Sequence, residues 1–306
     1  MNNEIIEVKQ AEILQAIDRA EVDIQIATAK QYPRNLAATL NKIATYATMD
    51  KETAEDCFYV LRRKDANGND NVIEGLSVRM AEIIAGAWGN LRVQTRIIGN
   101  DGRMITAQAI CHDLETNFAV SKEVKRRITT KNGKTYSEDM QVVTGNAAAS
   151  IAFRNAVLTV IPKAVTKKII NDVKQVALGQ AIDVETSRQN CLTNYARAGV
   201  TEAMICQYLG IKSVAEIDKE KLFELKATWN AIKEGTTSVQ ETFIQPALEA
   251  KAQQEAVKRA SNASEKAAAA IAQATGAVPA VPANIDPETG EIMDEKNNKK
   301  SSTSKK

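Results

Sequence analysis

The chain has 306 residues, with 40 basic and 38 acidic side chains that leave a net charge of +2. Hydrophobic residues make up 44% of it, so most of the chain should fold around a core. No run of 18 apolar residues is present, and the acidic N-terminal segment lacks the apolar stretch of a secretory signal. We therefore expect a cytoplasmic protein with no membrane segment and with reduced thiols.

The residues that could carry chemistry exclude most enzyme classes. His112 is the one histidine, no serine lies in a Gly-x-Ser-x-Gly sequence, and the four cysteines form no Cys-x-x-Cys pair. Gly133-Lys134-Thr135 looks like the end of a phosphate-binding loop, but Ile128 stands where that loop needs its first glycine, so a hairpin turn is the better interpretation. We predict that the protein is not an enzyme and holds no cofactor or metal, although a nuclease that binds metal through carboxylates stays open.

The N-terminal segment, 1–54, is predicted to be helical. Ile13, Leu14 and Ile17 recur at helical spacing, and the spacing resumes at Leu36. Tyr32-Pro33 should separate two helices, because proline lacks an amide donor and restrains the residue before it. Residues 1–60 hold ten acids against six bases, so this segment is acidic.

The segment 55–180 mixes strand and helix signals and predicts an α+β fold. Alternating apolar residues predict strands, Asn-Gly and Asp-Gly pairs predict turns, and helical spacing flanks both. One sheet face then needs helices to bury it. The predicted elements are a strand at 57–62, a turn at 65–70, a helix at 77–88, strands of an antiparallel meander at 91–98, 104–112 and 118–129, turns at 100–102 and 131–134, and a packing helix at 144–161 that Pro162 ends.

Three more segments follow this core. Residues 186–243 predict a small all-α module of three helices at 186–198, 201–209 and 218–234, in which Gly199 and Gly210 end helices. Residues 244–275 predict an alanine-rich helix. Residues 276–306 are rich in proline, alanine, acidic residues and then lysine and serine, a composition that predicts a disordered tail.

Positive charge concentrates between residues 117 and 174. This stretch holds eleven basic and four acidic residues, a net charge of +7 in a chain whose total is +2. Lys125 and Arg127 should share one strand face with Arg126 opposite, and the following hairpin adds Lys131 and Lys134. Such a hairpin suits phosphate backbones, because each neutralised phosphate releases counterions. A hairpin that is only solvated is the alternative.

The helix at 144–161 carries Arg154 and Asn155 near its middle. Small residues at 147–149 should let this helix approach the sheet closely, with Ile151, Leu158 and Ile161 as core candidates. Either Arg154 points into a groove, or it lies on the surface as most arginines do.

Short motifs in this region resemble single-strand annealing proteins. Val72-Ile73-Glu74-Gly75, then Val78-Arg79-Met80-Ala81-Glu82-Ile83 and Trp88-Gly89-Asn90 before a β-meander, are similar to the eukaryotic strand-annealing recombination mediators. Ala152-Phe153-Arg154-Asn155-Ala156-Val157 resembles the helix that ends their annealing core, and the order of elements resembles the phage Erf, RecT and Red-beta proteins. Residues 199–243 and Asp286-Pro287-Glu288-Thr289-Gly290-Glu291-Ile292 look like the C-terminal modules and tails of phage recombination proteins.

The resemblance implies ATP-independent binding and annealing of single-stranded DNA in phage-type homologous recombination. It also implies a homo-oligomeric ring or filament, and recruitment of a single-strand-binding protein or an exonuclease through residues 186–306. Because aromatic residues are only 4% of the chain, backbone neutralisation should outweigh base stacking. The predicted DNA-binding residues are Lys125, Arg126, Arg127, Lys131, Lys134 and Arg154, with Arg79 and Arg92 added.

Two other functions stay open. A passive single-stranded-DNA-binding replication accessory protein would share the basic patch without pairing strands. A structural or adaptor protein would act through its helical C-terminal module and bind no oligonucleotide.

Overall fold

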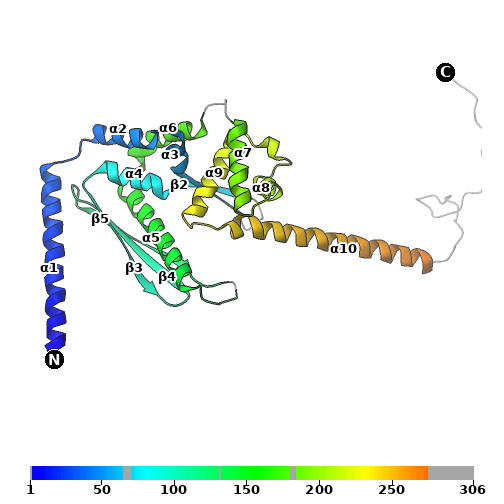
Figure 1. Cartoon of the computed structure of the whole chain (residues 1–306), viewed down its shortest axis with the longest axis horizontal. Helices are drawn as coiled ribbons and strands as arrows, with labels where there is room; N and C mark the ends of the chain where they lie inside the picture. Colours follow the sequence, from blue (N-terminus) through cyan, green and yellow to red (C-terminus); the bar gives the residue numbers. More distant parts are fainter. Residues whose placement is uncertain (1, 65–69, 131, 180–183, 275–306) are drawn as a thin grey trace, which may run out of the picture. The chain divides into compact units, whose positions relative to one another are not determined.

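The computed structural model describes residues 2–64, 70–130, 132–179 and 184–274. It confirms the predicted α+β class, with helices around one two-stranded and one three-stranded antiparallel sheet (Figure 1). The chain divides into two units, residues 1–249 and residues 250–306. Most of the turn predicted at 65–70 and all of the tail predicted at 276–306 lie outside the described residues.

The N-terminal helices are α1 (Asn2–Gln31), α2 (Leu36–Ala47) and the short α3 (Lys51–Asp56). As predicted, the chain breaks at Pro33 between the first two, and α2 restarts where Asn35 accepts a hydrogen bond from the Ala38 amide at 3.0 Å. The sequence patterns did not predict α3, whose six residues are too few to show helical periodicity.

A two-stranded hairpin follows, made of β1 (Phe58–Lys64) and β2 (Asp70–Leu76). The strands are antiparallel, with Tyr59 opposite Gly75. The predicted strand at 57–62 corresponds to β1, whereas β2 was not predicted. We call this pair the β1–β2 hairpin.

The three-stranded sheet is the predicted meander, in the order β3 (Leu91–Asn100), β4 (Met104–Asp113) and β5 (Phe118–Arg127). Alternate residues of β4 are buried, so one sheet face belongs to the core. The turn between β3 and β4 is held by Asp101, whose carboxylate accepts from the Met104 amide at 2.6 Å. The buried residues of β4 are Ile105, Ala107, Ala109, Cys111 and Asp113.

Three helices complete the core: α4 (Val78–Trp88), α5 (Glu138–Val160) and α6 (Lys163–Leu178). α5 lies across the sheet (Figure 1), and a Cβ on Gly145 would approach the Ile105 side chain to 3.0 Å. It begins at the Ser137 cap, earlier than predicted at 144. Pro162 ends α5 as predicted, but it is also the N-cap of α6. The sequence patterns did not predict α6, which is bent by 117° relative to α5.

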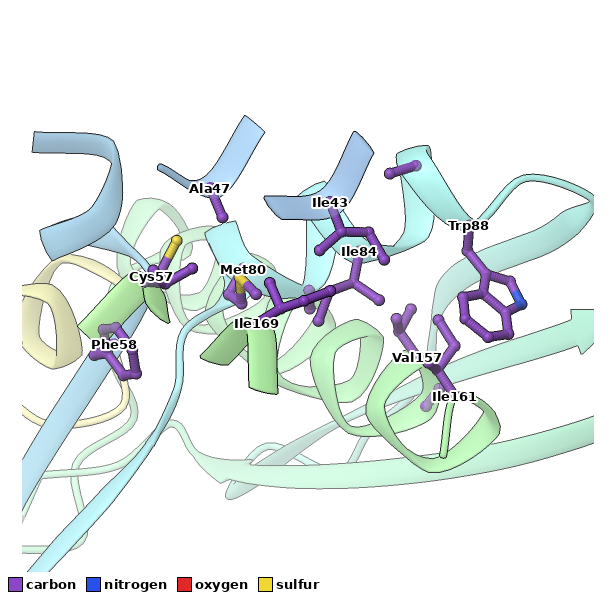
Figure 2. Packing of buried hydrophobic residues seen from close by; sticks show 14 of the residues in the cluster. Ile43, Ala47, Cys57, Phe58, Met80, Ile84, Trp88, Val157, Ile161 and Ile169 are labelled. Carbon is purple, nitrogen blue, oxygen red and sulfur yellow. The ribbon is translucent and has the colours of Figure 1, made fainter. Parts of the chain in front are cut away.

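The main hydrophobic core joins these elements. Figure 2 shows Ile43 of α2 and Ile84 of α4 packed near Val157 of α5 and Ile169 of α6. Small buried residues on α5, including Ala148 and Ala152, bring that helix close to the sheet. These contacts position the second half of α5 and the start of α6 beside the β1–β2 hairpin.

The C-terminal part of the unit contains the three predicted helices, α7 (Val184–Arg197), α8 (Glu202–Leu209) and α9 (Lys219–Lys233). They have their own apolar cluster, which includes Tyr195, Ile205 and Leu225. However, α9 also packs against β1, and its Phe223 belongs to the main core. Because α9 contributes to both clusters, the predicted separation of a core at 55–180 from a helical module at 186–243 stays a prediction. The chain continues through a π-helix (Gln240–Ile244) into α10 (Gln245–Ala274), where the alanine-rich helix was predicted.

Within the described ranges, no single helix is long and apolar enough to cross a membrane, and α5 with α6 passes that test only as a sharply bent pair. The four cysteines are free, and Cys57, Cys111 and Cys191 are buried. Burial raises the pKa of the Cys57 thiol to about 12, which keeps it protonated and unreactive.

Candidate nucleic-acid interface

The predicted residues of β5 are divided between the two faces of the sheet. Lys125 pairs with Thr106 and Arg127 with Met104, and both side chains are exposed on the face opposite α5. Arg126 points to the α5 side, so the predicted alternation along this strand is confirmed. We call the outer surface, defined by Arg92, Arg96, Lys125 and Arg127, the open sheet face.

Two arginines of the open sheet face already have partners within the molecule. Arg92 lies 3.4 Å from Glu21 and donates to Gln25 of α1 at 3.0 Å. Arg96 donates to Gln108 at 2.9 Å. Lys125 and Arg127 have no ion pair with a described residue.

Lys134 and Arg79 lie apart from this surface. Lys134 is exposed in the predicted turn after β5, where Thr129 pairs with Thr135. Lys131 lies outside the described residues. Arg79 is exposed on α4 and forms an ion pair with Glu82 at 2.7 Å.

Arg126 and Arg154 are engaged inside the protein. Arg126 donates to the backbone carbonyls of Gly235 and Thr236, the latter at 3.3 Å. Arg154 is only 6% exposed, and its guanidinium lies 4.5 Å from the centre of the Tyr59 ring. The predicted cations therefore do not form one continuous trough, because tertiary contacts place these two arginines on the opposite side of the sheet from Lys125 and Arg127.

A groove with a volume of about 770 Å³ runs between the β1–β2 hairpin and α5–α6. This size lies within the usual range of roughly 300–1,000 Å³ for binding clefts. We call it the hairpin groove. Its polar lining residues are Tyr59, Glu74, Lys122, Arg154, Asn155, Thr159, Lys163, Thr166, Lys167 and Asn171.

The charge in the hairpin groove is positive. Lys122, Lys163 and Lys167 form no ion pair within the part of the chain that the structure describes. The one acidic lining residue, Glu74, is neutralised by Lys174, whose Nζ lies 2.6 and 2.7 Å from its two carboxylate oxygens. An anion entering the groove would meet several lysines and a carboxylate that already has a partner.

The start of α6 adds a second positive element. Its cap, Pro162, has no side chain that can accept a hydrogen bond, and no acidic residue lies in the first turn. Ile161, Lys163 and Ala164 line the groove at this point. Amide groups at a helix N-terminus favour anions, because they lack partners and carry the positive end of the helix dipole.

Arg154 supplies a donor that is buried and unpartnered. It lines the groove, and its Nη1 atom makes no hydrogen bond. Glu234 is nearby, with Oε2 at 3.5 Å from Nη1, a separation too long for a good charge-assisted bond. A buried guanidinium with unused capacity beside uncapped amides is suited to a phosphate group.

The sequence patterns allowed Arg154 to point into a groove but did not select Lys122, Lys163 or Lys167. These lysines were missed because the strand β2, which forms the opposite wall of the groove, was not predicted. The turn cluster at 65–70 lies between two runs with strand composition, a pattern that indicates a hairpin. Recognising β2 would have directed attention to the lysines that follow Pro162.

Within the described ranges, no group of three or more His, Cys, Asp or Glu side chains is arranged to hold a metal ion. His112 instead lies 2.9 Å from the Asn117 side chain, through Nε2. Comparisons of the chain with protein-family models, curated proteins and solved structures found no match.

Proposed function

We propose that the protein binds single-stranded DNA in the hairpin groove and anneals complementary strands without ATP. The observation that carries this proposal is the set of groove cations that have no ion pair with a described residue, Lys122, Lys163 and Lys167, around the buried Arg154. Sugar-phosphate backbones are recognised by such clusters, with affinity that falls as salt rises.

The groove favours contact with the backbone over contact with bases. Tyr59 lines the groove, but its ring is not free to stack on a base. The Arg154 guanidinium lies over the ring, and Gly75 of the neighbouring strand lies against it. A Cβ on Gly75 would lie 2.6 Å from the ring. With the ring enclosed, stacking on bases contributes little, and the bases remain free to pair.

Annealing by this arrangement would need no nucleotide hydrolysis. Two complementary strands repel each other through their phosphates. Cations that neutralise one strand, while its bases stay unstacked from protein, lower that repulsion. Pairing then proceeds from the favourable energy of the duplex itself.

The test compares two double charge reversals, Lys163→Glu with Lys167→Glu in the groove and Lys125→Glu with Arg127→Glu on the open sheet face. Binding of labelled oligothymidylate is measured by anisotropy over a salt series. The groove variant should lose at least about tenfold in affinity, and its salt slope should fall by about 1.4, or about 0.7 for each phosphate that is no longer neutralised. The open-face variant carries the same charge change and should stay close to the parent.

The reverse ranking, with the open-face variant weakened and the groove variant unaffected, would move the site to the open sheet face. Annealing is then tested by mixing complementary labelled strands without ATP. Accelerated pairing supports the proposal. Binding without acceleration supports passive strand binding, and no binding supports the adaptor function.

We also propose, from the resemblance, that the subunits assemble into rings or filaments and that residues 186–306 recruit a single-strand-binding protein or an exonuclease. Electron microscopy with and without an oligonucleotide tests the assembly. Rings or helices that extend with DNA support it, and an unchanging monomer contradicts it.

A further inference from the structure

The turn at 234–236, which follows α9, contacts the core next to Arg154, a residue that lines the hairpin groove. Glu234 Oε1 accepts a hydrogen bond from the Val78 amide, at the start of α4, at 2.7 Å. Arg126 of β5 donates to the carbonyls of Gly235 and Thr236. One short turn therefore contacts α4, α5 and β5 together.

The turn is packed tightly against α5. Gly235 has a φ of +68°, a conformation that favours glycine, and a Cβ there would lie 2.6 Å from the Ala147 Cβ. The approach is close enough that only glycine fits without a shift of the backbone or of α5.

The polar contacts at this joint are nevertheless incomplete. Across the described ranges, four buried side-chain polar atoms lack a hydrogen-bond partner, and three of them lie here: Arg154 Nη1, Glu234 Oε2 and Thr236 Oγ1. Native proteins rarely leave buried polar atoms unpaired, because each one costs about 1–3 kcal/mol. The joint thus combines tight packing with incomplete polar bonding.

We propose that Glu234 occupies Arg154 in place of a DNA phosphate, and that a strand entering the hairpin groove displaces Glu234 and loosens the 234–236 joint. This inference rests on the proposed function, because it assigns a built-in competitor to the same groove. The loosening would be felt first at the start of α4, where Glu234 accepts a hydrogen bond from the Val78 amide.

The competition follows from the contact geometry. The carboxylate and Arg154 Nη1 are 3.5 Å apart without a hydrogen bond, whereas phosphate oxygens can accept two parallel bonds from a guanidinium. Burial also raises the pKa of Glu234, so its charged form is held at an energetic cost even beside Arg154. Linkage requires the coupling to be reciprocal, so weakening the Glu234 contact must tighten strand binding.

The first experiment measures oligothymidylate affinity for Glu234→Gln against Glu185→Gln. Both changes remove one negative charge, but Glu185 is an exposed residue of α7 that pairs with Arg188 and does not contact Arg154. Glu234→Gln should bind about fivefold tighter or more, with a salt slope steeper by about 0.7, whereas Glu185→Gln should match the parent.

The second experiment follows amide hydrogen exchange in the unaltered chain. The Val78 amide is bonded to Glu234 and should exchange faster when oligothymidylate is added. The Met80 amide, held by the Ser77 hydroxyl at 3.2 Å, is the matched internal control and should not change.

The outcomes separate this inference from the proposed function. If the parent binds no single-stranded DNA, both fall. If the parent binds but Glu234→Gln binds no tighter and the Val78 amide stays protected, the competition is overturned and the groove site stands. If Glu234→Gln does not fold, the exchange measurement on the parent decides alone.

Discussion

Two arginines, Arg34 and Arg154, have largely buried side chains and similar neighbours but differ in their hydrogen bonds. Each guanidinium lies over an aromatic ring, at 4.6 Å from the centre of Trp88 and 4.5 Å from that of Tyr59. Arg34, between α1 and α2, donates from both Nη atoms to the two oxygens of Asp113 at 2.7 Å. Arg154 faces one carboxylate at 3.5 Å and forms no hydrogen bond with it.

The carboxylates record this difference in opposite pKa shifts. Burial alone would raise the pKa of Asp113, but the hydrogen bonds and charge of Arg34 outweigh it, and the pKa is lowered. Burial raises the pKa of Glu234, and the Val78 amide and Arg154 do not reverse it. A well-bonded arginine anchors the fold, whereas a poorly bonded one keeps capacity for a ligand.

The largest effect that would test this contrast is on stability. Arg34→Met should lower the free energy of unfolding by about 3–5 kcal/mol, because Asp113 is left buried without its partner. Arg154→Met should lower it less, by about 1–2 kcal/mol, because Glu234 loses an attraction across 3.5 Å but no hydrogen bond. Urea unfolding followed by circular dichroism measures both, and equal decreases would remove the distinction.

Strand binding should reverse that ranking. Arg154→Met should weaken oligothymidylate binding about tenfold, because it removes one charge-assisted hydrogen bond to a phosphate. Arg34→Met, assayed where it remains folded, should bind like the parent, since Arg34 lies outside the hairpin groove. Normal affinity in Arg154→Met would make Arg154 a structural residue only.

The pH dependence of stability should have opposite signs at the two sites. The Arg34–Asp113 contribution is present above pH 3.8 and lost as pH falls through the lowered folded pKa, so parent and Arg34→Met should converge below 3.8. Glu234 has a raised folded pKa, so the parent should gain stability relative to Glu234→Gln as pH falls toward 4.5. Urea titrations across this range test both signs.

Strand affinity should follow the titration of Glu234. Protonation near and above pH 4.5 frees Arg154, so the parent should bind more tightly as pH falls, and Glu234→Gln should lose this dependence. The charged groups around Glu234 are Arg154 on α5, Arg79 and Glu82 on α4, and Arg126 on β5. A dependence retained in Glu234→Gln would assign the effect to another group.

The smallest expected effect concerns the ring beneath Arg154. Gly75→Ala should cost about 1 kcal/mol of stability and weaken strand binding, because its Cβ would displace Tyr59 from under the guanidinium. Gly99→Ala is the control, since its Cβ would meet Thr106 at an ordinary 3.9 Å. Equal behaviour of the two variants would show that Tyr59 does not position Arg154.

Local sequence signals account for most of the elements. Gly210 ends α8 as predicted, and Asp218 caps α9 by accepting from the Lys221 amide at 2.9 Å. Strand alternation correctly separated Lys125 and Arg127 from Arg126. These features depend on residues within a few positions of one another, so composition and spacing reveal them.

The elements that were missed had weak local signals. The short α3 shows no full period, and Pro162 indicated the end of one helix without indicating the start of the next. Residues 72–75 were used as a family motif, but the strand β2 that contains them was not predicted. Because β2 and the start of α6 are walls of the hairpin groove, missing them hid the groove lysines as well.

The sequence by itself determined the α+β class, most helix and strand positions, and the concentration of positive charge after residue 117. Only the tertiary structure decided which cations are paired. Arg126 bonds to carbonyls 109 and 110 residues further along the chain, and Arg154 faces Glu234 across the same joint. Periodicity and capping act over a few residues, whereas these partners meet only because the packed core brings distant segments together.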